Sequence, residues 1–79
     1  MKQDPLSPAA TLREAIKQIG SQTATGRLLG VSQAAVWAWL NEGKVLPAEH
    51  VLRVEEATGI SRHRLRPDVY GPEPAEHAA

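Results

Sequence analysis

Residues 21–43 read SQTATGRLLGVSQAAVWAWLNEG, and this stretch predicts two short helices joined by a tight turn. A serine stands before each predicted helix, over residues 22–29 and 33–41, where its hydroxyl can accept a backbone hydrogen bond and cap the helix. Gly30 can end the first helix because glycine adopts the left-handed backbone conformation without a steric cost. An eight-residue helix, a turn of about three residues and a nine-residue helix together give the pattern of a helix-turn-helix unit.

The small and apolar residues of this stretch fit two helices that cross closely. Gly26 lies where the crossing is expected, and an interior glycine costs a helix about 1 kcal/mol relative to alanine, so its presence indicates a tight approach. Val31 precedes the serine cap of the second helix and Val36 stands at the fourth helical position, which is the arrangement of a hydrophobic staple. The residues expected to fill the seam between the helices are Leu29, Val31, Val36 and Trp39.

The second helix of the pair has an apolar face and a free face when its residues are placed about 100° apart around the axis. The apolar face, expected to join the core, holds Val36, Trp39 and Leu40, and the free face holds Gln33, Ala34, Trp37 and Asn41. Gln33 stands near the helix N-terminus, where recognition helices contact base edges, and a glutamine amide can make two hydrogen bonds to adenine. The free face therefore predicts base contacts in the major groove of DNA.

The rest of the chain predicts further helices and no strands. A helix is expected to begin at Pro8 and to stop at Gly20, another to run from Pro47 to Thr58, and a single turn to form over residues 62–65. Pro8 suits the first helical position because the N–H that proline lacks has no partner there. No stretch alternates between apolar and polar residues over a useful length, as a half-buried strand would. We therefore expect an all-α fold, a small domain of about five short helices.

Composition divides the chain into a short N-terminal segment, one domain and a tail. Residues 1–6 are expected to be flexible, residues 7–67 to form the helix-turn-helix domain, and residues 68–79, rich in proline and glutamate, to be disordered. The formal net charge is zero, but all nine lysines and arginines lie in residues 1–66, with only six of the nine acidic residues. This basic body suits a nucleic-acid partner and equally an ordinary solvated surface.

Several classes of protein and site are not expected. With no cysteine, the chain has no disulfide framework and no thiolate metal site, and its three histidines are too scattered to predict a metal site. No apolar run approaches the ~18 residues of a membrane span, so we expect a soluble cytoplasmic protein. No glycine-rich phosphate loop and no catalytic triad context is present, so neither an enzyme nor a cofactor is expected.

Residues 21–36, SQTATGRLLGVSQAAV, resemble the helix-turn-helix of phage Cro repressors. With KVLPAEHV at 44–51 and RHRLRPDVYG at 62–71, the wider chain resembles the all-helical Cro-like proteins grouped with the YdaS antitoxins. The resemblance implies a small lambda-repressor-like domain that binds double-stranded operator DNA and represses transcription in a bacterial or phage-infected cell. It also implies a toxin partner. A homodimer is expected on DNA, with half-sites about one helical turn, ~34 Å, apart.

Carried over by position, the resemblance implies two sets of DNA-contacting residues. Gln22 is expected to contact a phosphate or to support Gln33. The residues expected to face the bases are Ser32, Gln33, Ala34, Trp37 and Ala38. The residues expected at phosphates are Gln22, Thr23, Arg27, Asn41 and Lys44. Arg27 lies on the helix that crosses the DNA backbone, and Lys44 follows the recognition helix directly.

The chain departs from this family at two positions, since members often have a polar residue at position 37 and alanine at position 26. Trp37 leaves three roles open, which are packing against thymine methyl groups, contact with another protein, and partial burial. The second role gives an alternative function, a protein-interaction module or antitoxin that binds a toxin or a second copy of the chain through the Trp37 face. Phosphate contact and solvated surface also both stay open for the basic cluster Arg62, His63, Arg64 and Arg66.

Overall fold

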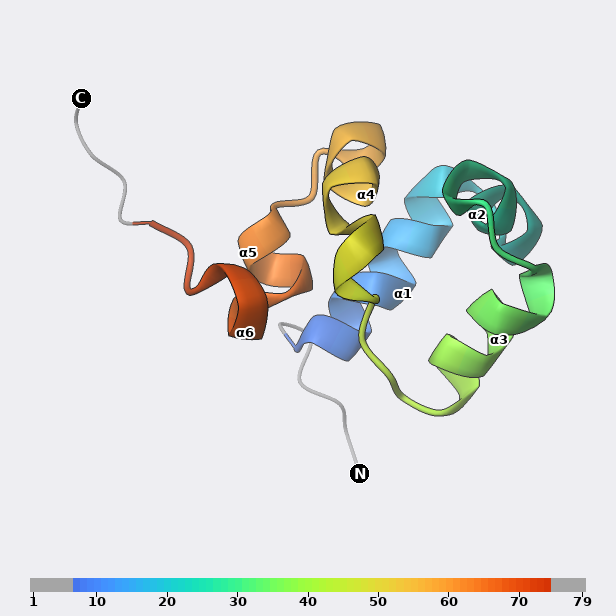
Figure 1. Cartoon of the computed structure of the whole chain (residues 1–79), viewed down its shortest axis with the longest axis horizontal. Helices are drawn as coiled ribbons and strands as arrows, with labels where there is room; N and C mark the ends of the chain where they lie inside the picture. Colours follow the sequence, from blue (N-terminus) through green and yellow to red (C-terminus); the bar gives the residue numbers. More distant parts are fainter. Residues whose placement is uncertain (1–6, 75–79) are drawn as a thin grey trace.

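The structure is a computed structural model that describes residues 7–74, and within that range the chain folds into helices joined by short loops (Figure 1). The helices are α1 (Pro8–Ile19), α2 (Gln22–Leu29), α3 (Gln33–Asn41), the 3-10 turn η1 (Ala48–His50), α4 (Val51–Thr58), α5 (Arg62–Leu65) and α6 (Pro67–Tyr70). No strand occurs in residues 7–74, so the predicted all-α fold is confirmed. Over the same range, every helix is too short or too polar to cross a lipid bilayer.

Serine side chains fix where four of the helices begin. The hydroxyls of Ser7, Ser21 and Ser32 each accept a hydrogen bond from the backbone N–H three residues later, at 3.1, 3.0 and 3.1 Å. Ser61 accepts a similar bond from the N–H of His63 at 3.0 Å, at the start of α5. These bonds satisfy N–H groups that have no partner within the first turn of a helix. The predicted starts of α1, α2, α3 and α5 are therefore confirmed.

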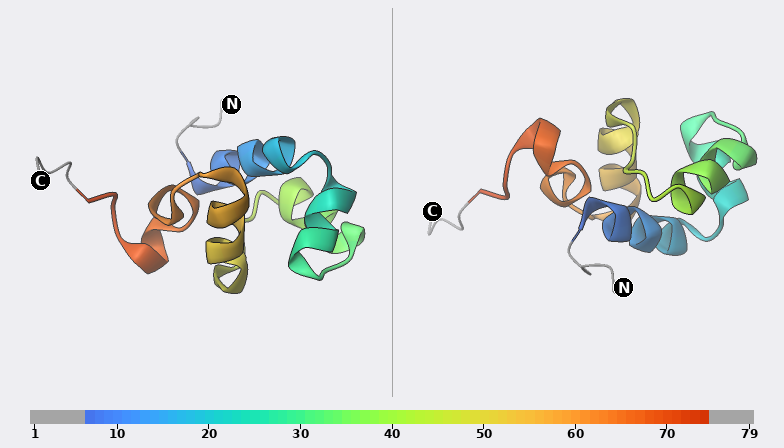
Figure 2. Two further views of the ribbon diagram at one scale, coloured as in Figure 1. Left: turned by 90° about the horizontal axis from the view of Figure 1, so that it is seen from above. Right: turned by 90° about the horizontal axis from the view of Figure 1, so that it is seen from below.

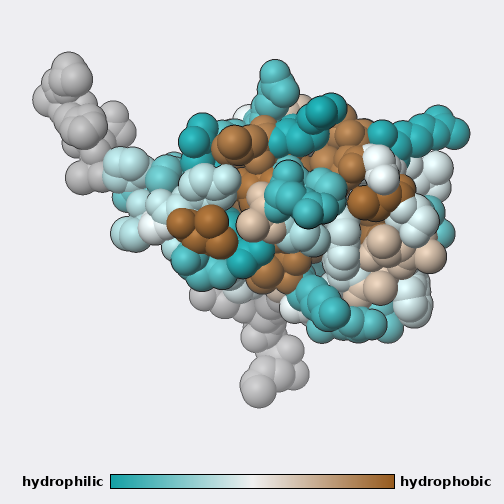
Figure 3. Space-filling view, in the orientation of Figure 1, coloured by the Kyte–Doolittle hydropathy of each residue, from teal (hydrophilic) through white to brown (hydrophobic). Residues whose placement is uncertain are grey.

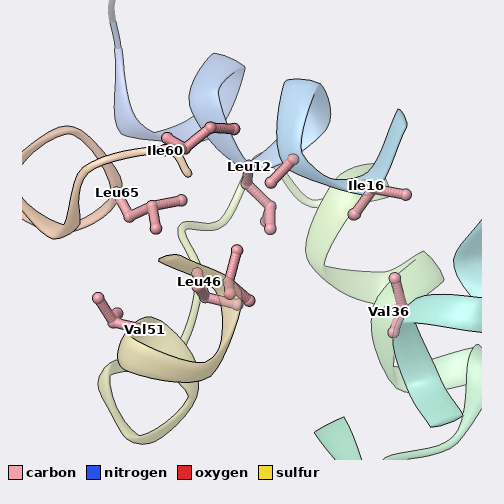
Figure 4. Close-up of a cluster of buried hydrophobic side chains, with 9 residues drawn as sticks. Leu12, Ile16, Val36, Leu46, Val51, Ile60 and Leu65 are labelled. Atoms are coloured by element: carbon pink, nitrogen blue, oxygen red, sulfur yellow. The ribbon is translucent and has the colours of Figure 1, made fainter. Parts of the chain in front are cut away.

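The hydrophobic core lies between α1, α4 and α5 and extends to the inner side of α3 (Figure 4). α1 contacts α2, α3, α4 and α5, which makes it the central element. The buried apolar residues are Leu12, Ala15, Ile16, Val36, Leu46, Val51, Val54, Ile60 and Leu65. Of the residues predicted for the α2–α3 seam, Val36 is buried, and the partly buried residues packed on the core include Leu29, Val31 and Trp39.

The two ends of the molecule carry different pairs of helices. α2 and α3 lie together at one end, α5 and α6 lie together at the other, and α1 and α4 lie between them (Figure 1 and Figure 2). The last described residues extend from α6, on the side away from α3. The outer surface of α3 is therefore remote from the C-terminal end of the described chain.

The predicted helix over residues 47–58 begins later than expected. Pro47 has extended backbone angles, φ −57° and ψ 139°, so it precedes the helix instead of opening it. The chain then makes the 3-10 turn η1 and becomes α-helical only at Val51. The prediction was wrong about the start because a proline that presets φ is equally compatible with the extended backbone that leads into a helix.

α6 is a helix that the sequence does not predict. It covers residues 68–70, where the sequence predicts the start of a disordered tail. Pro67 presets the backbone of the first helical position. The guanidinium of Arg66 donates to both carboxylate oxygens of Asp68, at 2.9 and 2.7 Å, and to the carbonyl oxygen of Leu46 at 2.8 Å. These bonds connect the start of α6 to the loop after α3, so α6 depends on contacts that exist only in the folded chain.

Candidate nucleic-acid interface

α2 and α3 pack against each other through a tight turn over residues 30–32. Gly30 ends α2 in the left-handed conformation, with φ 74° and ψ 28°. The N–H of Val31 then donates to the carbonyl oxygen of Gly26 at 2.9 Å, and Ser32 caps α3. The two helices and the turn form the helix-turn-helix unit that the sequence predicts.

Gly26 is buried at the point where α2 meets this turn. A Cβ atom added to Gly26 would lie 2.6 Å from the carbonyl oxygen of Val31 and 3.4 Å from the backbone nitrogen of Gln33. Real Cβ atoms essentially never come within 3.0 Å of another heavy atom in this way. The predicted tight approach is confirmed, and the close neighbour is the backbone of the turn, not a side chain of α3.

Gln22 opens α2 and Gln33 opens α3, and the structure brings their side chains together. The Nε2 of Gln33 donates to the Oε1 of Gln22 at 2.5 Å. An amide has two N–H donors and one carbonyl acceptor, so Gln33 keeps its carbonyl oxygen and one N–H without a hydrogen-bond partner among residues 7–74. This contact matches one of the two roles expected for Gln22, the support of Gln33.

The outer face of α3 is open to solvent. Trp37 is half exposed, whereas Trp39 packs against the core with its ring 6.0 Å from the ring of His50. The two tryptophans therefore lie as the helical wheel predicts. Ala38 is half-buried, and the exposed residues of this face and its cap are Ser32, Gln33, Ala34, Trp37 and Asn41.

The two cations expected at phosphates differ in their partners. Arg27, on α2, is exposed, and its side chain makes no ion pair or hydrogen bond with the described part of the chain. Lys44 lies 3.0 Å from a carboxylate oxygen of Glu42, and both side chains are more than half exposed. Exposed ion pairs contribute about 1 kcal/mol at most, so Lys44 can exchange this partner for a phosphate. Thr23, another predicted phosphate contact, is exposed in the first turn of α2.

The three arginines of the C-terminal basic cluster are all paired with carboxylates. The pairs are Arg62 with Glu55 at 2.9 Å, Arg64 with Glu14 at 3.1 Å, and Arg66 with Asp68 at 2.7 Å. In the same cluster, the Nδ1 of His63 lies 3.1 Å from the carbonyl oxygen of Gly71. The pairs of Arg62 and Arg64 connect α5 to α4 and α1, at the end of the molecule opposite α3 (Figure 1). Of the two interpretations left open for this cluster, the structure favours a surface role within the fold.

The acidic groups whose pKa is shifted belong to these ion pairs. Hydrogen bonds from the backbone N–H and the guanidinium of Arg62, each at 3.0 Å, hold the pKa of Glu55 below its ordinary value. The hydrogen bonds of Arg66 lower the pKa of Asp68 in the same way. Within residues 7–74, no three histidine, aspartate or glutamate side chains group so that they could hold a metal ion.

Comparison with known proteins finds a family and a relative to which this chain is similar. Residues 12–74, which include the whole α2–α3 unit, match the family model described as "Bacterial toxin YdaS". Over 61 residues the chain is 38% identical to a protein of Escherichia coli (strain K12) described as "Putative transcriptional regulator YdaS". The match covers 75% of this chain and 62% of that protein, so the chain spans less than two thirds of the length of this relative. No solved structure matches the chain.

Proposed function

The chain belongs to the YdaS family, and from this membership we propose that it is a sequence-specific repressor that binds double-stranded operator DNA of the phage or prophage type. α3 is the proposed recognition helix, lying in the major groove with α2 across the DNA backbone. The observation that carries the proposal is the open outer face of α3, which begins with the supported amide of Gln33. The proposed activity is binding, without a catalytic step or a cofactor.

Gln33 keeps the hydrogen-bonding groups that recognition of adenine requires. Its carbonyl oxygen can accept from the N6 amino group of adenine, and its second N–H can donate to N7. Its first N–H is already held by Gln22, so the amide loses less rotational freedom on binding than an unsupported glutamine would. Ser32, Ala34 and Ala38 flank this position as further proposed contacts with the major groove.

The proposed phosphate contacts surround the recognition helix. Gln22 and Thr23 stand in the first turn of α2, and the N-terminal end of a helix favours an anion. Arg27 supplies a cation without a partner among the described residues, and Asn41 and Lys44 follow at the far end of α3. We propose a homodimer on DNA, because half-sites one helical turn apart, about 34 Å, present the same groove to two copies of α3.

Selection of bound duplexes from a random library, with wild type and Gln33→Ala in parallel, tests this proposal. Wild type is expected to enrich a palindrome with an adenine at one fixed position of each half-site. Gln33→Ala should bind that duplex about 1–3 kcal/mol more weakly and lose the preference for adenine at that position, because its side chain no longer reaches the base.

Two further variants separate base recognition by Gln33 from its support by Gln22 and from the loss of a glutamine elsewhere. Gln22→Ala removes the support of the amide but leaves the reader, so it should bind more weakly than wild type while it enriches the same palindrome. Gln18→Ala removes an exposed glutamine from α1 and should leave both affinity and sequence unchanged. The proposal is wrong if the folded wild type enriches no sequence at low salt, or if Gln33→Ala keeps the preference of wild type.

A second candidate function is binding to a toxin or to a second copy of the chain through the Trp37 face. The formal net charge of zero and the half-exposed ring of Trp37 favour it. Salt discriminates between the two functions. A DNA-bound dimer in which Arg27 and Lys44 of each subunit neutralise a phosphate should lose about 10²-fold in affinity between roughly 50 and 200 mM salt, whereas an apolar interface is much less sensitive.

A further inference from the structure

The ring of Trp37 is a large apolar group on a face that is otherwise small or polar. Trp37 is 50% exposed, although full burial of such a side chain would stabilise the fold. Gln33 and Ala34 precede it by about one turn, and Asn41 follows by about one turn, all of them exposed. Leu40, three residues further along α3, is half-buried and packs on the core, so the exposed half of the Trp37 ring is available to a molecule that approaches this face.

Trp37 does not belong to one large apolar surface. The other strongly exposed large apolar side chains of residues 7–74 are Leu52 on α4 and Val69 on α6. α6 lies at the opposite end of the molecule from α3 in all three views (Figure 1 and Figure 2). On the face drawn in Figure 3, hydrophilic side chains divide the hydrophobic patches. Protein interfaces need a contiguous, well-packed patch, so a single ring suits a small apolar target better.

We propose that Trp37 recognises the 5-methyl group of a thymine in the major groove, an inference that rests on the DNA-binding function proposed above. Thymine is the base that presents a methyl group in this groove, and apolar side chains read it by contact. An indole carries one N–H donor and no acceptor, so its face offers apolar contact and little hydrogen bonding to base edges. The indole face would pack on the methyl group as Gln33 pairs with the adenine.

The spacing along α3 sets where this thymine lies. Gln33 and Trp37 are four residues apart, which corresponds to about 6 Å along a helix axis. Successive base pairs are about 3.4 Å apart. The thymine is therefore expected about two base steps from the adenine that Gln33 reads. The small side chains of Ala34 and Ala38, on either side of the ring in the sequence, allow the helix to approach the groove closely.

A methyl-deletion scan of the operator tests this inference. Each thymine of the duplex enriched by wild type is replaced singly by deoxyuridine, which lacks only the 5-methyl group. One position in each half-site, about two steps from the adenine, should weaken binding about fourfold, the loss that corresponds to one buried methyl-sized group. Deoxyuridine at the remaining thymines should have a smaller effect, because Ala34 and Ala38 can each contact a thymine only through one methyl group.

Variants of Trp37 then assign the effect to the ring. Trp37→Ala should bind the thymine and deoxyuridine duplexes equally, whereas Trp37→Phe keeps an apolar ring and should retain most of the difference. Leu52→Ala removes an apolar side chain of the same 50% exposure from α4 and should retain the whole difference. Far-UV circular dichroism of each variant checks that a loss of sensitivity is not a loss of fold.

The outcomes separate this inference from the function on which it rests. If wild type enriches no duplex, the proposed DNA-binding function is wrong, and so is the proposed thymine contact. If wild type enriches a duplex but tolerates deoxyuridine at every position, the repressor function stands and the role of Trp37 is wrong. The role is equally wrong if Trp37→Ala remains as sensitive to deoxyuridine as wild type, because another residue then reads the methyl group.

Discussion

At the scale of single residues, a missing Cβ atom at Gly26 allows the turn between α2 and α3 to close. Alanine would favour the helix by about 1 kcal/mol, but its Cβ would lie 2.6 Å from the carbonyl oxygen of Val31. That oxygen belongs to the backbone of the turn, so the overlap can be relieved only if the turn moves. The steric cost is therefore expected to exceed the gain in helix propensity.

Gly26→Ala is expected to lower the free energy of unfolding by up to about 2 kcal/mol, because overpacking of this kind costs ~1–3 kcal/mol and the gain in helix propensity offsets only about 1 kcal/mol of it. Urea denaturation followed by far-UV circular dichroism measures the change. Thr23→Ala, at an exposed position of the same helix, is the control and should be neutral or slightly stabilising. A Gly26→Ala protein as stable as wild type would contradict the steric argument.

The sequence predicted some of these residue contacts and not others. The tight approach at Gly26 was predictable because an interior glycine carries a local cost that needs a reason. The resemblance implied two roles for Gln22, contact with a phosphate and support of Gln33. Spacing along the chain alone does not choose between them. The pairing of Lys44 with Glu42 depends on side-chain rotamers at an exposed surface, which no pattern in the sequence fixes. The DNA-contacting residues themselves stay a prediction.

At the scale of helices, capping chemistry explains which boundaries the sequence could predict. α2 and α3 have the bounds expected from their serines and from Gly30, because a cap and a stop act within three or four residues. The 3-10 turn η1 and the helix α6 lack a side-chain cap of this kind. α6 instead follows Arg66, whose bonds to Asp68 and to Leu46 require the tertiary fold.

Ser21→Ala is expected to destabilise the protein by about 1 kcal/mol, because the N–H of Ala24 loses the hydroxyl that accepts its hydrogen bond. Ser21→Asp supplies another side-chain acceptor, and its charge is favourable at a helix N-terminus, so it should restore the stability of wild type. Thermal denaturation of the three proteins measures the difference. Equal stability of Ser21→Ala and Ser21→Asp would show that the cap contributes nothing.

At the scale of the whole molecule, one ion pair joins two distant segments of the chain at the end opposite α3. Arg64 and Glu14 are fifty residues apart in the sequence and 3.1 Å apart in the structure. The all-α fold followed from helical periodicity and from the absence of strand patterns, which are local signals. The carboxylate partners of the arginines did not follow from local signals, because the packing of the helices decides which carboxylate lies near each arginine.

Stability is expected to fall in acid because of the lowered pKa of Glu55. A carboxyl whose pKa is lower in the folded state contributes stability above its unfolded pKa, near 4.5, and loses it as the pH falls through the folded pKa. Urea denaturation at about pH 6 and at about pH 3 should show this decrease. Glu55→Gln should be less stable than wild type at the higher pH and should lose less on acidification.

Glu56→Gln is the control for this prediction, since Glu56 is exposed on the same helix and has no ion pair among residues 7–74. It should follow the pH dependence of wild type. If Glu55→Gln and wild type lose the same free energy of unfolding between the two pH values, the acid sensitivity arises from other carboxyls, with Asp68 as the next to test.

The placement of α3 and α6 at opposite ends has a practical consequence for any assay of this protein. A tether or fluorophore attached at residue 74, the last described residue, would leave from the α6 end (Figure 1). Immobilised in this way on a sensor chip, the molecule would present α3 outward, so a duplex could reach it without steric interference from the support. Measured association and dissociation rates would then report binding at the α3 surface and not the crowding imposed by the attachment.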